Sequence, residues 1–180
     1  EIVERKKDRI VENKIYPIDR LEKIDDKESL SKIKNDLKNI ISERKNILDL
    51  KLNIPHIMGV LNITPDSFSD GGLFIEEKEA YDHAKLMINN GATIIDIGGE
   101  STRPGSKTID EKEEWKRINN TIIKLKKDFP KIHLSLDTRK SYVMQNGIKN
   151  GIGIINDVSG LNFDNESFNV IKSKKIPFVL

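Results

Sequence analysis

The sequence has 180 residues, with 31 Lys or Arg against 29 Asp or Glu and a formal net charge of +2. This near balance argues against a protein that binds nucleic acid by bulk electrostatic attraction. The sequence contains no cysteine, which excludes disulfides, thiolate metal sites and a cysteine nucleophile. No apolar run approaches the roughly 18 residues of a membrane span, and the first residues lack an apolar signal-peptide core. We therefore expect a cytoplasmic protein that acts neither on nucleic acid nor at a membrane.

The N-terminal part of the chain differs in composition from the rest. Residues 1–50 hold 13 basic and 12 acidic side chains, and none of the 11 glycines precedes Gly59. We predict a charged helical segment or inter-domain linker over residues 1–52 and a second domain over residues 53–180. Seven apolar residues of the N-terminal segment recur largely at three- and four-residue steps, which is typical of one helix face. They are Leu30, Ile33, Leu37, Ile40, Ile41, Ile47 and Leu48.

The predicted N-terminal helix has two interpretations. Asp25, three residues before Glu28, indicates its start, as in a capping box. The helix could dock on a partner or a neighbouring domain, or it could pack on its own domain as part of a charged linker.

From residue 54 onward, short apolar runs alternate with helical patterns. The runs lie at residues 56–62, 93–98, 133–137, 152–157 and 177–180. Helices are predicted at residues 76–90, 111–128, 141–147 and 166–174. Continuous apolar strands that alternate with helices predict a parallel sheet. An open doubly wound sheet and a (β/α)8 barrel both fit this α/β pattern.

Polar residues at the ends of four apolar runs favour the barrel. These residues are Asn62, Asp96, Asp137 and Asn156. Parallel α/β folds assemble their chemistry at the carboxyl ends of strands. An open sheet concentrates its site at one switch point, whereas four consecutive strands that each deliver a polar group suit a barrel mouth. Glycine-rich dinucleotide and P-loop patterns are missing from the sequence, so ordinary nucleotide phosphate sites are not supported.

The loops after the first two runs are rich in hydroxyl, carboxylate and glycine residues. Residues 62–72 read NITPDSFSDGG, and residues 96–105 read DIGGESTRPG. Such loops can offer backbone N–H and hydroxyl donors to an anion. Arg103 could form paired hydrogen bonds to phosphate oxygens.

Four stretches of the sequence resemble the dihydropteroate synthases, the pterin-binding enzymes of folate synthesis. The stretches are residues 58–72, 91–105, 135–138 and 154–157, each at a predicted strand end and all in the family's order. The resemblance covers roughly residues 55–180 and implies a (β/α)8 barrel of the TIM type. It also implies a transferase that condenses hydroxymethyl-dihydropterin diphosphate with para-aminobenzoate and releases diphosphate, with Mg²⁺ as cofactor.

This resemblance implies roles for individual residues. Asn62 is the candidate Mg²⁺ ligand, near the diphosphate. Asp137 is the candidate catalytic residue, since it could stabilise the cation that forms when diphosphate departs. Asp137, Asn156 and Val158 are candidate pterin contacts, because a carboxylate and an amide can pair with the ring's polar groups. The two loops supply candidate diphosphate and para-aminobenzoate contacts: Thr64, Asp66, Ser67, Phe68, Thr102, Arg103 and Pro104.

Several of these residues also have purely structural interpretations. Asp137 could cap the following helix, and Asn62 and Asn156 could form turns. Arg103 could be a solvated surface side chain. Asp96 could belong to the site, or it could be a structural carboxylate inside the barrel that accepts hydrogen bonds from loop backbone; the sequence favours neither.

The length of the chain departs from the family. A (β/α)8 barrel takes roughly 200–250 residues, whereas residues 53–180 supply about four strand–helix units and the start of a fifth strand. We expect a truncated barrel whose activity belongs to a longer parent and which is inactive in isolation. The resemblance allows two kinds of protein partner, a second copy of the parent in a homodimer and a fused pterin diphosphokinase domain upstream.

Two other functions remain open from the sequence. One is a non-catalytic split or degenerate half-barrel that acts only through assembly. The other is a pterin-dependent methyltransferase, although the first loop argues against it.

Overall fold

The chain forms two compact units, Glu1–Arg44 and Lys45–Leu180. The computed structural model describes residues 2–6, 9–14, 17–24, 26–64, 73–103 and 105–179. The second unit begins at Lys45, ahead of residue 53 where the sequence analysis divides the chain. The difference arises because Leu50 is buried together with Ile94 and Ile154 of the second unit.

The N-terminal unit contains a β-hairpin that the sequence analysis did not predict. Strand β1 (Ile2–Lys6) pairs antiparallel with β2 (Arg9–Lys14), so the structure differs here from the expected helix or linker. The two strands are separated in the sequence by Lys7 and Asp8, without the glycine or asparagine that signals a hairpin turn. A 3-10 helix, η1 (Ile18–Lys23), follows the hairpin.

Helix α1 (Lys27–Ile41) is shorter than the predicted apolar stripe. Its N-cap is Asp26, whose side chain accepts hydrogen bonds from the backbone N–H groups of Glu28 at 3.1 Å and Ser29 at 3.2 Å. The helix ends before Leu48, which has a left-handed backbone with φ of 57°. Ile47 and Leu48 therefore do not share the helix face, and no residue of α1 is buried.

The second unit is built on a five-stranded parallel sheet, as predicted. Its strands are β3 (Met58–Asn62), β4 (Ile94–Gly98), β5 (His133–Asp137), β6 (Ile154–Asn156) and β7 (Phe178–Val179). The spatial order of the strands is the same as their sequence order, whereas a doubly wound sheet reverses its order at a switch point. The arrangement is thus that of a (β/α)8 barrel opened after five strands.

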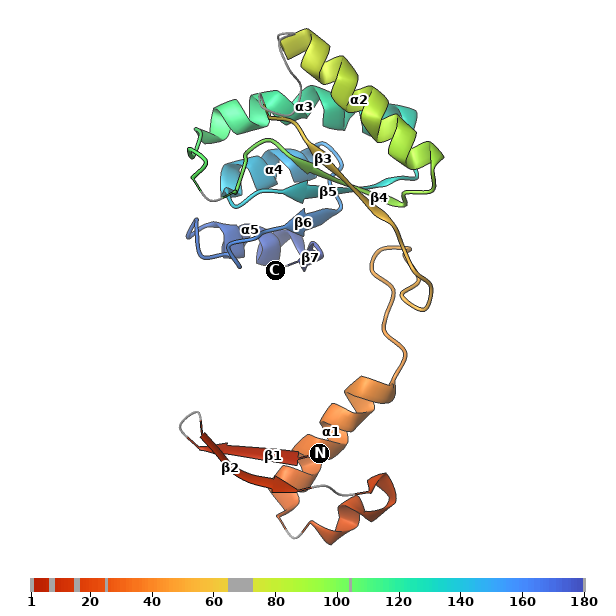
Figure 1. Cartoon of the computed structure of the whole chain (residues 1–180), viewed down its shortest axis with the longest axis vertical. Coiled ribbons are helices and arrows are strands. Elements are labelled where there is room, and N and C mark those ends of the chain that lie inside the picture. The colour runs from red at the N-terminus through yellow and green to blue at the C-terminus, as the bar shows by residue number, and fades with distance from the viewer. Residues whose placement is uncertain are drawn as a thin grey trace. The chain divides into compact units, whose positions relative to one another are not determined.

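Each predicted helix is present between its two strands. The helices are α2 (Leu73–Asn89), α3 (Glu111–Asp128), α4 (Ser141–Lys149) and α5 (Ser167–Lys174). Figure 1 shows them arranged in sequence order along the sheet, and consecutive helices contact one another. Within the described residues, no helix combines the length and apolar content that a membrane crossing requires.

The two faces of the sheet have different chemistry because successive side chains of a strand point to opposite faces. The helix-covered face carries Leu61, Ile97 and Leu136, which are fully buried in the main core with apolar residues of all four helices. Each such side chain contributes about 1.5–3 kcal/mol of burial free energy. The opposite face carries Met58, Ile94 and His133 at the amino ends of β3 to β5, and Asn62, Asp137 and Asn156 at the carboxyl ends of β3, β5 and β6. This arrangement leaves the polar strand ends free to form a site.

Candidate active site

Four residues from neighbouring strands form a strand-end row on the uncovered face of the sheet. In the parallel register, Asn62 of β3 pairs with Gly98 of β4, Gly98 pairs with Asp137 of β5, and Asp137 pairs with Asn156 of β6. Asn62, Asp137 and Asn156 are predicted from the sequence as site residues, and the structure brings them together. Because Asn62, Asp137 and Asn156 all end strands, none of the three lies in a turn.

Gly98 leaves a space in the middle of the strand-end row. A Cβ atom at Gly98 would lie 3.4 Å from Oδ1 of Asn62 and 3.5 Å from Oδ2 of Asp137. The amide oxygen and the carboxylate oxygen therefore border the same small space, separated by a backbone that has no side chain. Two oxygen donors of this kind fit Mg²⁺, which prefers oxygen ligands and keeps several waters or substrate oxygens.

A larger all-protein metal cage is not found in the described part of the chain. No group of three or more His, Cys, Asp or Glu side chains is arranged there to hold a metal ion.

Asp96 lies one row deeper than the predicted site residues and orients one of them. It pairs with Val60 and Ser135 in the register and is 4% exposed. Its Oδ2 accepts a 2.9 Å hydrogen bond from Nδ2 of Asn156. This bond commits the amide nitrogen and leaves the amide oxygen as an acceptor. The hydrogen-bond partner that the structure describes for Asp96 is thus the side chain of Asn156, and the role of Asp96 in the site stays a prediction.

Two buried polar atoms beside Asn156 have no hydrogen-bond partner within the described residues. They are Oδ1 of Asp96 and Oγ of Ser135, which lie in the same row of the sheet. Unpaired buried polar atoms are uncommon in proteins, and these two lie directly beneath the strand-end row.

The carboxylate of Asp137 is held in an unfavourable environment for negative charge. Burial is the main cause that raises its pKa from 3.8 to about 6, and the charges of Asp96, Glu114, Asp157 and Glu100 add to it. Perturbed carboxylates of this kind gather at functional sites. Asp137 does not cap the next helix, because the N-cap of α4 is Lys140.

The loop after β6 is held by a residue that the sequence analysis did not single out. Asp157 is fully buried and accepts hydrogen bonds from Ser159 N at 2.8 Å, Ser159 Oγ at 2.7 Å and Leu161 N at 3.0 Å. Val158, a predicted pterin contact, stands 66% exposed in this loop. The sequence feature that could have pointed to Asp157 is its position directly after Asn156, at the end of a predicted strand.

The predicted loop residues are only partly within the described structure. Thr64 is half-buried just after β3, and Thr102 and Arg103 are exposed in the loop after β4. The candidates Asp66, Ser67, Phe68 and Pro104 lie outside the described residues. The structure therefore leaves the predicted roles of these loop side chains as predictions.

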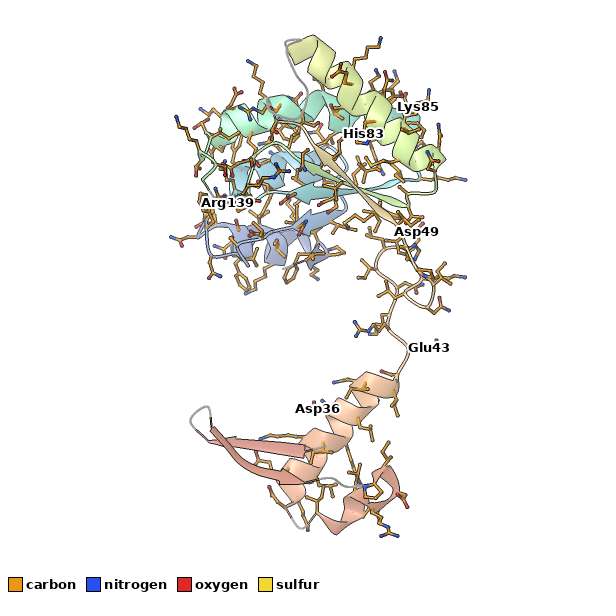
Figure 2. All side chains as sticks on the ribbon, in the orientation of Figure 1. Asp36, Glu43, Asp49, His83, Lys85 and Arg139 are labelled. Carbon is orange, nitrogen blue, oxygen red and sulfur yellow. The ribbon has the colours of Figure 1, made fainter. Side chains whose placement is uncertain are left out.

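A mostly apolar cavity of about 540 Å³ lies at the opposite end of the strands. Its lining includes Asp49, Leu50, Thr93, Phe129 and His133. Figure 2 shows Asp49 and Arg139 at opposite ends of the sheet, with Arg139 just beyond the carboxyl end of β5. Barrel enzymes place their chemistry at the carboxyl ends, and the strand-end row lies at that end of the sheet. We therefore assign the candidate active site to that end.

Comparison with known proteins identifies the family of the chain. The family model described as "Pterin binding enzyme" matches residues 58–180. A dihydropteroate synthase from Clostridium beijerinckii is 46% identical over 125 residues, which cover 69% of this chain and 46% of the relative. The chain therefore spans about half the length of such curated relatives.

Two solved structures have the same fold. A dihydropteroate synthase from Clostridium difficile, determined in the presence of pteroic acid, is 46% identical with a TM-score of 0.65 over 68% of this chain and 46% of that one. The enzyme from Xanthomonas albilineans with 4-aminobenzoic acid is 38% identical, with a TM-score of 0.70 over 77% of this chain and 52% of that one.

Proposed function

The chain belongs to the pterin-binding enzyme family, and from this membership we propose that it supplies the first part of a dihydropteroate synthase barrel. The reaction joins hydroxymethyl-dihydropterin diphosphate to para-aminobenzoate. The bond between the pterin methylene and the diphosphate oxygen breaks, a bond forms from the methylene to the amine nitrogen, and the amine loses a proton.

The observation that carries this proposal is the strand-end row. Asn62 and Asp137 border one space across Gly98, and Asn156 is oriented beside them by Asp96. A ring with adjacent N–H groups and nitrogens can donate to Asp137 and to the amide oxygen of Asn156. A carboxylate next to the methylene favours the positive charge that develops there as diphosphate leaves.

Asp137 acts best in this role when it is ionised. Because burial raises its pKa to about 6 in the chain without bound metal, the carboxylate is largely charged at neutral pH, and Mg²⁺ bound beside it would favour the charged form further. A carboxylate kept partly desolvated interacts more strongly with a developing cation than one in bulk water.

We propose that the leaving diphosphate lies between the strand-end row and the loop that carries Thr102 and Arg103. Asn62 Oδ1 and Asp137 Oδ2 would hold Mg²⁺, with water and diphosphate oxygens completing the coordination. When bound, the metal neutralises negative charge on the leaving group. Arg103 would donate to phosphate oxygens from the loop. Thr64, Asp66, Ser67, Phe68 and Pro104 keep their predicted roles around diphosphate and aminobenzoate.

The first test is binding. We expect the purified chain to bind 6-hydroxymethylpterin, followed by its fluorescence, and Asp137→Asn to weaken this binding about 10-fold, by loss of a charged hydrogen bond. Asp36→Asn, on the exposed surface of α1 (Figure 2), is the matched control and should change nothing. Equal pterin affinity in the wild type and Asp137→Asn would count against the proposed site.

The second test separates an enzyme from a half-barrel that acts only through assembly. Residues 58–179 are joined to the barrel portion of the Clostridium beijerinckii relative that this chain does not match. We expect the chimera to release diphosphate and form dihydropteroate, and Asp137→Asn to abolish turnover. A folded chimera that binds pterin without turnover would favour the non-catalytic alternative.

A further inference from the structure

Lys140 is a buried cation that the proposed reaction does not use. Its side chain is 7% exposed, and its Nζ donates to Glu100 Oε1 at 3.0 Å, Glu114 Oε2 at 2.7 Å and the carbonyl oxygen of Ile109 at 2.8 Å. These three acceptors match the three protons of an ammonium group. Lysine is almost never buried unless it is paired in this way.

Lys140 closes the base of the loop after β4. Glu100 stands at the start of this loop and Ile109 at its end, and Glu100 Oε1 also accepts a 2.9 Å hydrogen bond from the N–H of Ile109. We name the set Lys140, Glu100, Glu114 and Ile109 the Lys140 clasp. The clasp joins Glu100 and Ile109, which lie on either side of the loop. Fixing these two ends offsets part of the conformational entropy that the loop loses when it is ordered.

The charges of the clasp are balanced by a second cation. Arg139 Nε donates to Glu100 Oε2 at 3.1 Å, and Arg139 Nη2 donates to Thr108 Oγ1 at 3.3 Å. Glu114 also accepts a 2.6 Å hydrogen bond from Thr138 Oγ1. Two carboxylates and two cations therefore satisfy one another in a region from which water is largely excluded. Removing one member leaves an uncompensated buried charge.

The clasp is joined to the strand-end row through the backbone. Asp137, Thr138, Arg139 and Lys140 follow one another at the end of β5. The N–H of Thr138 donates to the carbonyl oxygen of Asn156 at 3.0 Å. The segment that carries Asp137 is thus the same segment that holds the loop with Thr102 and Arg103.

We propose that Lys140 is a positioning residue for anion binding: through the Lys140 clasp, it holds the described loop residues 101–103 and 105–108 in the arrangement that receives the diphosphate group beside Asp137. Nζ of Lys140 already donates to three acceptors within the clasp, whereas Arg103 is exposed in the loop. This inference rests on the proposed function, because that function supplies the diphosphate.

The test compares Lys140→Met with Lys32→Met in the whole chain. Lys32 forms an exposed 2.7 Å pair with Glu28 and is the matched control. In Lys140→Met we expect the Ile109 amide to exchange with deuterium at least about 10-fold faster, and inorganic diphosphate to bind about 10-fold more weakly, since charge-assisted hydrogen bonds are lost. Affinity for 6-hydroxymethylpterin should stay within about 2-fold at pH 8, where Asp137 is ionised, because the hydrogen bonds of Lys140 go to Glu100, Glu114 and Ile109 rather than to the strand-end row. Lys32→Met should match the wild type in all three measurements.

A second variant guards against simple loss of folding. Lys140→Met combined with Glu114→Gln removes one positive and one negative charge and leaves the Arg139–Glu100 pair. Circular dichroism and urea unfolding show that each variant is folded. We expect the double variant to remain folded and to show the same selective loss of diphosphate affinity.

The outcomes separate this inference from the proposed function. If folded variants keep the wild-type diphosphate affinity and Ile109 exchange, the positioning role is overturned while pterin binding by the wild type still supports the function. If both affinities fall together, Lys140 has a general structural role and the inference is also overturned. A wild-type chain that binds neither pterin nor diphosphate overturns both proposals.

Discussion

Asn156 and Asp96 meet across the face of β5, where Nδ2 of the amide donates a 2.9 Å hydrogen bond to Oδ2 of the carboxylate. Their strands are not neighbours, since β5 lies between β4 and β6. The contact therefore exists only because the sheet register sets both side chains on the same face. It gives Asp96 two separable effects, a hydrogen bond to Asn156 and a negative charge near Asp137.

Substitution of Asp96 should separate these two effects. Asp96→Asn keeps an acceptor for Asn156 but removes a charge that raises the pKa of Asp137. We expect that pKa to fall below about 6 in Asp96→Asn, as followed by carbon NMR of the Asp137 carboxyl group. Asp96→Leu also removes the hydrogen bond, so pterin affinity should fall about 10-fold. An unchanged Asp137 titration in Asp96→Asn would contradict this reading.

The raised pKa of Asp137 makes stability depend on pH. The protonated form is favoured by folding, so the stabilising contribution is complete below pH 3.8 and is lost as the pH rises through about 6. At pH 7 we expect Asp137→Asn to raise the free energy of unfolding by about 1 kcal/mol, a discounted value because Asp137 is only half-buried. Urea unfolding at pH 4 and pH 7 measures it. A variant less stable than the wild type at pH 7 would refute the prediction.

Two glycine substitutions should have contrasting effects. Gly98→Ala places a methyl group at ordinary contact distance from Asn62 and Asp137, so folding should change by less than about 1 kcal/mol. The methyl group fills the space between the two oxygens, and we expect Mg²⁺-dependent binding of inorganic diphosphate to weaken at least about 10-fold. Calorimetric titration with and without Mg²⁺ tests this, and unchanged diphosphate affinity would show that the space is not used.

Gly147→Ala tests packing on the helix-covered face of the sheet, because Gly147 lies in α4 against Leu136 of β5. A Cβ there would lie 2.5 Å from Cδ2 of Leu136, closer than van der Waals contact allows. We expect the free energy of unfolding to fall by about 1–3 kcal/mol from overpacking. Urea denaturation provides the value, and a neutral effect would mean that α4 can move away from β5 freely.

Removal of Asp157 should loosen the loop after β6. Asp157→Ala leaves the N–H groups of Ser159 and Leu161 without their buried acceptor, which should destabilise the chain by about 1–3 kcal/mol. Asp157→Asn keeps one acceptor oxygen and should lose less. Thermal unfolding ranks the three proteins, and equal stability of Asp157→Ala and the wild type would argue against the anchoring role.

Much of the barrel unit could be predicted from local patterns. The strand ends at Asn62, Asp137 and Asn156 follow from apolar runs that stop at polar residues, and the helices between them follow from their periodicity. The hairpin of residues 2–14 could not be predicted in this way. Strand pairing depends on a partner along the chain, and nothing in the short charged segment between the strands signals a turn.

The sequence by itself determined the alternation of strands and helices, the polar residues that end three of the strands and the resemblance to a family. These are properties of neighbouring residues and of their order, which local propensity and burial make readable. Only the tertiary structure decided that Asp96 orients Asn156, that Gly98 leaves a space between Asn62 and Asp137, and that Lys140 closes the loop after β4. The hydrogen bonds in these relationships join residues 26 to 60 positions apart. Sheet register and desolvation set them, and both exist only in the folded chain.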